Sequence, residues 1–101
     1  MQTTYYKKDK HLVCDIEEDI DECSVQNLKR RMDNEIQRYM PKEVIFDFSN
    51  VSFMDSAGIG ALLSRYRKMK ALGGETVVFG EDPRIRRILK LSGIYQIMRS
   101  I

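Results

Sequence analysis

A serine that directly follows an aspartate is the residue of this chain best placed to do chemistry. Ser56 comes after Asp55 and before two glycines, Gly58 and Gly60, where an apolar helical pattern begins. A hydroxyl in the first turn of a helix lies beside backbone N–H groups that have no intrahelical partner, and beside the positive end of the helix dipole. Such a position suits a helix cap, an anion site or a serine that accepts a phosphate. Of these three uses, capping is the most common.

The other reactive side chains do not form a catalytic set. His11 is the only histidine, and it lies in a segment predicted to be a strand. Ser56 lacks the Gly-x-Ser-x-Gly surroundings of a nucleophile elbow. Gly58-Ile59-Gly60 has neither the continuation of a dinucleotide fingerprint nor the lysine of a phosphate loop. Cys14 and Cys23, with one histidine, cannot complete a zinc or iron site, so we expect reduced thiols. We therefore expect no enzyme, no metal and no cofactor.

Size and composition indicate one soluble domain. The chain has 101 residues, enough for a single core, so residues 1–101 are expected to form one domain. Hydrophobic residues make up 43% and charged residues 32%, which is ordinary for a globular protein. No apolar run approaches the roughly 20 residues that span a bilayer, and the first residues resemble no secretory signal. The expected location is the cytoplasm, with no membrane partner.

The formal net charge of +2 hides an asymmetry between the two halves. Residues 1–50 hold 8 Lys or Arg against 11 Asp or Glu, whereas residues 51–101 hold 9 against 4. Acidic residues crowd positions 15–22, and basic residues crowd 65–70 and 84–87. Such blocks are usually solvated faces, but they can steer a charged partner. Sparse aromatic residues and the lack of a reading-helix motif argue against nucleic-acid binding.

Helical periodicity appears three times along the chain. Each stripe repeats apolar residues at steps of three and four, which indicates one buried helix face. The stripes are Val25, Leu28, Met32, Ile36 and Tyr39; then Ile59, Leu62, Leu63, Tyr66, Met69 and Leu72; then Ile85, Ile88 and Leu89. The first helix can be capped by Asp21 or Ser24 and ends before Pro41. Gly73-Gly74 ends the second, and Asp82-Pro83 starts the third.

The segments between the helices suit strands. Short runs of β-branched and aromatic residues predict strands over 3–7, 11–16, 44–48 and 75–79, with 95–98 as a last strand or an extended tail. The first two strands could form a hairpin. Alternation of strands and helices then implies a parallel sheet with right-handed crossovers. Strand-to-helix loops gather at the carboxyl edge of such a sheet, so the loop over 17–22 should lie near Ser56.

The glycines after Ser56 point to close approach by a partner. Gly58 and Gly60 leave the start of the helix without bulky side chains. Each glycine weakens a helix by roughly 1 kcal/mol relative to alanine. Stability alone would not favour that cost. Binding of a partner is therefore a third interpretation, beside an enzyme and a nucleic-acid-binding protein.

The stretch Val51-Ser52-Phe53-Met54-Asp55-Ser56-Ala57-Gly58-Ile59-Gly60 closely resembles the signature of anti-sigma factor antagonists with the STAS fold. The resemblance continues through Arg65–Lys70, Gly73-Gly74, the strand at 75–79, and Pro83 to Ile94. The first half matches more weakly, mainly through Asp19-Ile20-Asp21. The resemblance implies an α/β STAS domain with a mixed, mostly parallel β-sheet and helices packed on it. The sporulation and stress-response antagonists are the members it looks most like.

The resemblance also implies a phosphorylation cycle. The unphosphorylated form would bind an anti-sigma factor, a serine kinase with a histidine-kinase-like ATP fold, and would thereby release a sigma factor. That kinase would phosphorylate Ser56 and let go. A manganese-dependent phosphatase of the PP2C type would restore the active form. This chain would be a substrate and a switch.

The resemblance assigns a partner surface around the serine. It comprises Asp19, Asp21, Met54, Asp55, Ser56, Ala57, Gly58, Ile59 and Gly60. Asp21 matches the family's acidic residue beside the serine, although capping of the first helix is an equally good use for it. Ser64, Arg67 and Lys68 on the second helix are weaker candidates.

The sequence departs from the family pattern at three places. Glu18 stands where the family usually has glycine, Ala57 replaces a second serine, and the chain ends at Ile101, short of a C-terminal helix found in many relatives. Part of the sheet face is therefore expected to be uncovered.

Two other functions remain open. One is a regulatory STAS subunit of a transporter or lipid-trafficking complex, which needs no phosphorylation and which the intact Asp-Ser pair argues against. The other is weak nucleotide binding, for which a phosphate loop and metal ligands are missing.

Overall fold

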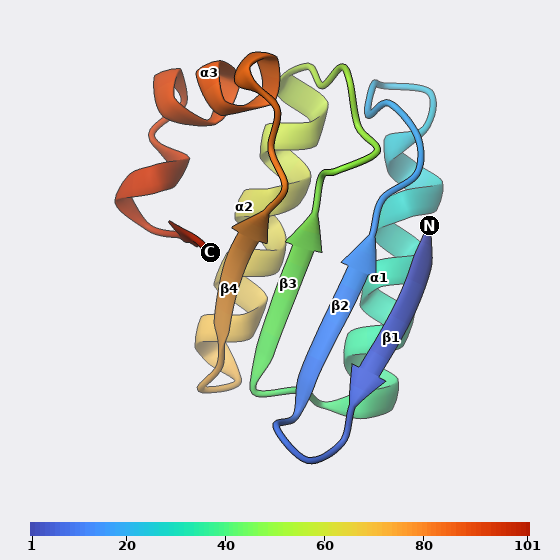
Figure 1. The fold of residues 1–101 in the computed structure, drawn as a ribbon. Helices are drawn as coiled ribbons and strands as arrows, with labels where there is room; N and C mark the ends of the chain where they lie inside the picture. Colours follow the sequence, from blue (N-terminus) through green and yellow to red (C-terminus); the bar gives the residue numbers. More distant parts are fainter.

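Five strands form one sheet, and two long helices cover one of its faces (Figure 1). A computed structural model describes all of residues 1–101. The strands are β1 (Gln2–Tyr6), β2 (His11–Asp15), β3 (Glu43–Asp47), β4 (Glu75–Phe79) and β5 (Arg99–Ser100), in that spatial order. The helices are α1 (Val25–Tyr39), α2 (Ser56–Ala71), α3 (Pro83–Leu91) and the 3-10 turn η1 (Ile94–Gln96). Only β1 and β2 pair antiparallel, so the sheet is mixed and mostly parallel, as expected.

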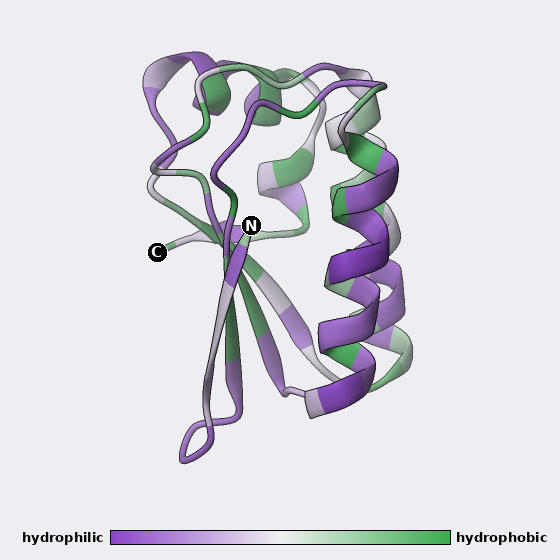
Figure 2. Cartoon of the chain, turned by 90° about the vertical axis from the view of Figure 1, so that its right-hand side faces the viewer, coloured by the Kyte–Doolittle hydropathy of each residue, from purple (hydrophilic) through white to green (hydrophobic).

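The core lies between the sheet and the pair α1 and α2. Residues of β2 and β3 alternate between buried and half-buried because successive side chains point to opposite faces. Leu12 and Phe46 are fully buried on the inner face, where they join Met32 of α1 and Leu62 of α2 in one apolar cluster. Figure 2 shows no helix over the opposite face of the sheet. That face is nevertheless only partly open, because Val13 and Ile45 on it are half-buried and Val77 of β4 is 1% exposed.

The buried stripe of α2 differs from the predicted one because it contains an arginine. Arg65 is only 3% exposed, whereas Leu72 is 47% exposed. Its guanidinium donates to both carboxylate oxygens of Asp33 on α1, over 3.0 and 2.6 Å, and also to the carbonyl of Ala61. Lys68 pairs with the same carboxylate at 2.9 Å. Placing Arg65 in a solvated basic block was therefore wrong, because Asp33 gives its charge a partner inside the helix interface.

The C-terminal segment is neither a strand over 95–98 nor an extended tail. Gly93 adopts a φ of 80°, which ends α3 and lets one 3-10 turn begin. The amide of Met98 then donates to the carbonyl of Ile94 at 2.8 Å. Ile94 and Met98 are both buried, and they stand four residues apart. This is the spacing of one face of a helical turn, whereas a strand would bury alternate residues. β5 follows this turn and pairs with β4 at Val77 and Val78.

A buried carboxylate ties this segment to the loop before α3. The side chain of Glu81 is 1% exposed. It accepts hydrogen bonds from the Tyr95 hydroxyl at 2.6 Å and from the Ser100 hydroxyl at 2.9 Å, and Arg86 lies 3.4 Å away. Burial, followed by the hydrogen bond to Glu81, raises the pKa of Tyr95 to about 12. Glu81 thus joins three parts of the C-terminal third around one charge.

Removal of the Asp33 carboxylate should destabilise the domain strongly. Asp33→Ala leaves the Arg65 guanidinium buried without its partner, and breaking a buried ion pair in this way costs about 3 to 5 kcal/mol. Asp33 is itself 32% exposed. We therefore expect the free energy of unfolding in urea to fall by about 3 kcal/mol, the lower end of that range. The exposed neighbour Asn34 is the control, and Asn34→Ala should change stability by less than about 0.5 kcal/mol.

The same ion pair should make stability depend on pH in acid. Burial alone would raise the pKa of Asp33, but the hydrogen bonds from Arg65 and Lys68 outweigh it and hold that pKa below its usual value. The stabilisation is complete above the unfolded pKa of about 4 and is lost as the pH falls through the lower folded value. Equal acid sensitivity of the wild type and Asp33→Ala would contradict this role.

Candidate functional site

Three strand-to-helix loops meet at one end of the sheet, as predicted for a parallel arrangement. Figure 1 shows the loops after β2, β3 and β4 at the end where these strands finish. The first two loops are joined by a parallel bridge between Ile20 and Met54. In this bridge the Ile20 amide donates to the Phe53 carbonyl at 3.0 Å, and the Asp55 amide donates to the Ile20 carbonyl at 3.1 Å. The acidic loop over 17–22 therefore lies directly beside the segment that leads to Ser56.

Ser56 is the first residue of α2, and its hydroxyl is free. Asp55 caps the helix, with an extended backbone and a carboxylate that accepts from the Ala57 amide at 2.8 Å. The Asp55 carbonyl accepts from the amides of Gly58 and Ile59. Ser56 is exposed, and its side chain forms no hydrogen bond within the chain. Capping, the commonest use of a serine here, is thus performed by its neighbour.

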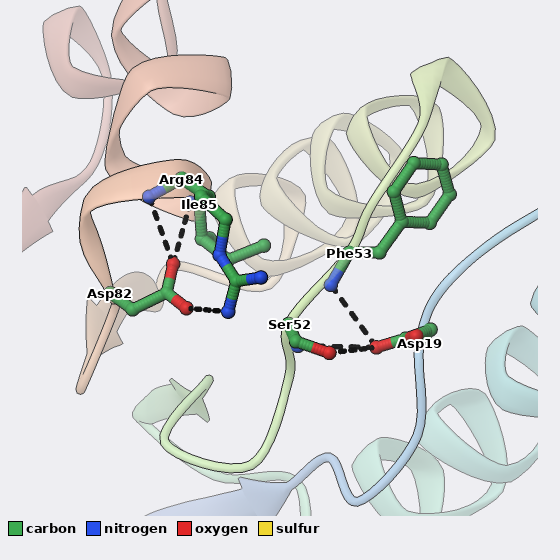
Figure 3. Close-up of polar contacts among 6 residues, drawn as sticks. All are labelled: Asp19, Ser52, Phe53, Asp82, Arg84 and Ile85. Carbon is green, nitrogen blue, oxygen red and sulfur yellow. Dashed lines mark hydrogen bonds and ion pairs between the residues drawn. The ribbon is translucent and has the colours of Figure 1, made fainter.

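Asp19 holds the loop before Ser56 in place. Its Oδ1 accepts from the amide and the hydroxyl of Ser52, at 3.1 and 3.0 Å, and from the amide of Phe53 at 3.1 Å (Figure 3). The hydrogen bonds from Ser52, together with that from Phe53 and the charge of Arg84, hold the pKa of Asp19 below its usual value. Asp19 was expected at the partner surface. It is exposed there, but it also positions the loop.

Phe53 is an exposed residue of this loop that the sequence did not single out. Its side chain is 51% exposed, although the apolar neighbours Val51 and Met54 are buried. Figure 3 shows the ring extending away from Asp19 and Ser52 while its amide is held by Asp19. An exposed aromatic ring on a fixed backbone is a common anchor in protein interfaces. No local pattern distinguishes such a phenylalanine from a core residue.

Two residues expected at the partner surface lie inside the domain. Met54 is 1% exposed and belongs to the core. A Cβ at Gly58 would overlap the Met54 side chain, coming within 2.6 Å of its sulfur and within 3.1 Å of Ile20 Cγ2. Gly58 is therefore required for internal packing, and its place at a partner surface stays a prediction. Nothing lies within 4 Å of a Cβ at Gly60, so that glycine does leave open space.

The remaining expected residues lie at the surface or half-buried. Asp55, Ala57 and Ile59 are half-buried in the first turn of α2. Asp21 is half-buried, and its Oδ1 accepts from the amides of Cys23 at 2.8 Å and Ser24 at 2.9 Å. It therefore caps the turn that leads into α1, while the Ser24 hydroxyl donates to the Asp19 carbonyl at 2.9 Å. Asp21 therefore caps this turn and not α1 itself, whose N-cap residue is Ser24 without a side-chain cap hydrogen bond, and its partner-binding role stays a prediction.

The third loop brings positive charge to the same edge. Asp82 caps α3 by accepting from the amides of Arg84 and Ile85, and its other oxygen pairs with the Arg84 guanidinium at 2.8 Å. Figure 3 shows this group beside Ser52. No cluster of three His, Cys, Asp or Glu side chains could hold a metal ion. No helix is long and apolar enough to cross a membrane.

Comparison with known proteins identifies the family. A model of the STAS domain matches residues 2–101. The chain belongs to the STAS domain family. It is 32% identical over 87 residues to the anti-sigma F factor antagonist of Paenibacillus polymyxa. The aligned residues cover 86% of this chain and 74% of that protein.

Solved structures agree with this assignment. This STAS domain is similar to the anti-sigma factor antagonist SpoIIAA in its unphosphorylated form, with a TM-score of 0.84 and 25% identity over 99% of this chain and 86% of that one. It is also similar to the Bacillus cell fate determinant SpoIIAA in the phosphorylated form, with a TM-score of 0.74 and 25% identity over 99% of this chain and 89% of that one. The family expected from the Asp-Ser motif is therefore confirmed.

The two glycines of α2 should respond oppositely to the same substitution. Gly58→Ala forces the new methyl into Met54, and overpacking costs about 1 to 3 kcal/mol, against a gain of about 1 kcal/mol in helix propensity. We expect a net loss of about 1 kcal/mol in the free energy of unfolding for this STAS domain. Gly60→Ala enters open space and should stabilise by about 0.5 to 1 kcal/mol. Urea denaturation of both variants tests this, and shifts in the same direction would refute the packing argument.

Proposed function

We infer that this STAS domain is an anti-sigma factor antagonist that phosphorylation of Ser56 switches off. In its unphosphorylated form it binds an anti-sigma factor that is also a serine kinase, and this binding releases a sigma factor. The kinase then transfers a phosphate from ATP to Ser56 and dissociates. A phosphatase of the PP2C type removes the phosphate and restores binding. The likeness to antagonists named for sigma F favours sporulation as the setting.

The observation that carries this proposal is the free hydroxyl of Ser56 at an exposed helix start. Two serines lie in this part of the loop, and they differ in their bonding. The Ser52 hydroxyl donates to Asp19 at 3.0 Å, so a phosphate there would displace this bond and face a carboxylate. The Ser56 hydroxyl has no such partner, because Asp55 caps the helix. A kinase can reach Ser56 without breaking any contact of the fold.

A phosphate on Ser56 is compatible with the folded domain. It adds about −1.5 to −2 charges at neutral pH. The positive end of the helix dipole favours an anion at that place. The helix cap and the bridge between Ile20 and Met54 involve other atoms, so they stay intact. The switch therefore acts at the surface and not through unfolding.

Dissociation follows from the electrostatics of the interface. Asp19 and Asp55 already place negative charge near Ser56, and a phosphate adds to it. Burying that charge against a partner without compensation costs several kcal/mol. A loss of about 4 kcal/mol would weaken binding by roughly a thousandfold. Before modification, the exposed ring of Phe53 and the open backbone at Gly60 offer apolar contacts to a partner.

Phosphorylation should occur at Ser56 alone. The protein is incubated with the candidate anti-sigma factor kinase of the same genome and ATP, and intact and peptide masses are measured. We expect one phosphoryl group on the wild type and on Ser52→Ala, and none on Ser56→Ala. The Ser52 variant is the matched control because it removes the loop hydroxyl nearest to Ser56 in the sequence. An unmodified wild type, with the kinase active on another substrate, would favour a STAS regulatory subunit that needs no phosphorylation.

A carboxylate at position 56 should weaken binding of the kinase. Ser56→Asp adds about half the charge of a phosphate, so we expect roughly half of the 4 kcal/mol, or about thirtyfold weaker binding than Ser56→Ala. Calorimetric titration with the kinase and its nucleotide measures both affinities. Circular dichroism of the two variants should coincide. Equal affinities of the Asp and Ala variants would rule out charge repulsion as the cause of release.

A further inference from the structure

The outer side of α3 carries a concentration of positive charge that the function proposed above does not use. Its members are Arg84, Arg86, Arg87 and Lys90, which we call the α3 basic face. The inner side of the same helix is apolar, with Ile85 and Leu89 fully buried. The inner side alone therefore packs α3 against the domain. The four cationic residues are all exposed and take no part in this packing.

Two of these cations have carboxylate partners and two do not. Arg84 pairs with Asp82 at 2.8 Å, and Arg86 lies 3.4 Å from Glu81. Arg87 and Lys90 form no ion pair within the chain. Arg86, Arg87 and Lys90 surround a hollow of about 530 Å³ whose other walls are Pro83 and Tyr95. Such a hollow, with uncompensated charge on its rim, fits an acidic side chain of another molecule.

The α3 basic face begins, at Arg84, on the edge that contains Ser56. Figure 3 places the Arg84 guanidinium beside Ser52, in the loop that leads to the serine. The charge of Arg84 also reaches Asp19, whose pKa it helps to lower. In Figure 1, α3 lies on one side of the β3–α2 loop and the loop over 17–22 lies on the other. The edge is therefore basic on the flank where α3 begins and acidic on the other, with the β3–α2 loop between them.

We propose that the α3 basic face is part of the surface that docks the anti-sigma factor kinase, and that it recognises an acidic patch on that protein. This rests on the function proposed above and names the chemistry of the partner. The occupant is a protein because the acidic flank at Glu17, Glu18 and Glu22 would repel a nucleic-acid backbone or an anionic bilayer lying across the edge. A protein can present both signs of charge. Two opposite contacts also fix its orientation over Ser56, and they raise the association rate.

Charge reversal at the two unpaired cations tests the proposal. The double variant Arg87→Glu with Lys90→Glu is compared with Arg38→Glu with Lys8→Glu, whose cations are exposed on α1 and in the turn between β1 and β2. Both double variants have the same net charge, so a difference between them reports the place of the charge and not its amount. Thermal melts of both should confirm that they fold. Association rates with the purified kinase are measured by stopped flow at low and at high salt.

At low salt we expect association of the α3 variant to be about tenfold slower than that of the wild type, and the control to stay within about twofold. High salt should remove most of the difference, because exposed charges are screened. Equal rates for the two double variants would overturn the proposal. So would unchanged kinase binding together with binding of wild type to phosphatidylserine vesicles or duplex DNA that depends on Arg87 and Lys90.

The same samples separate this proposal from the one on which it rests. A wild type that is phosphorylated at Ser56, with an α3 variant that binds as fast as the control, overturns only the role of α3. A wild type that neither binds nor accepts phosphate overturns the antagonist function and the α3 proposal together. Slower association of the α3 variant alone, with Ser56 still phosphorylated at saturating kinase, supports both.

Discussion

The bridge between Ile20 and Met54 determines where every group of the site lies. Strands β2 and β3 end at Asp15 and Asp47, and loops that leave adjacent strands are otherwise free to diverge. The bridge renews their pairing beyond the sheet, and the Asp19 carboxylate closes the gap between them by binding Ser52 and Phe53. Met54 is drawn beneath the helix start, which only a residue without a side chain at position 58 permits. The bridge thus fixes where α2 begins, and it leaves Ser56, the first residue of α2, exposed.

This arrangement separates groups that stabilise the fold from groups that remain available to a partner. Asp55 caps the helix, Asp19 ties the loop, and Met54 with Gly58 fills the space below. None of these contacts involves Ser56, Gly60 or the ring of Phe53. A surface built in this way can gain or lose a charge while the helix, the loop and the core keep their contacts. Such independence suits a domain whose signal is read from outside.

The sequence predicted the elements well because their patterns are local. The apolar spacing of α1, the proline after its end and the glycines after α2 each report on a few neighbouring residues. It failed where a distant residue decides the outcome. Arg65 is buried only because Asp33 faces it from another helix, and Met54 is internal only because Ile20 pairs with it. Phe53 is exposed for the same reason, since the loop that fixes its backbone lies far away in the chain. The Asp-Ser motif indicated the family, but it could not show which residues around it are buried and which are exposed.

The buried carboxylate of Glu81 has a consequence for the order in which this protein is made. Its hydrogen-bond donors, Tyr95 and Ser100, come after the Ser56 segment in the chain and so leave the ribosome later than that segment. Before Tyr95 and Ser100 are synthesised, the Glu81 carboxylate has only Arg86 as a partner. The loop that leads into α3 then lacks its hydrogen bonds to the C-terminal segment. The Ser56 segment is complete much earlier in synthesis. The acidic flank of this edge should therefore fold before the basic flank. Nascent chains should expose Ser56 before the α3 basic face has formed.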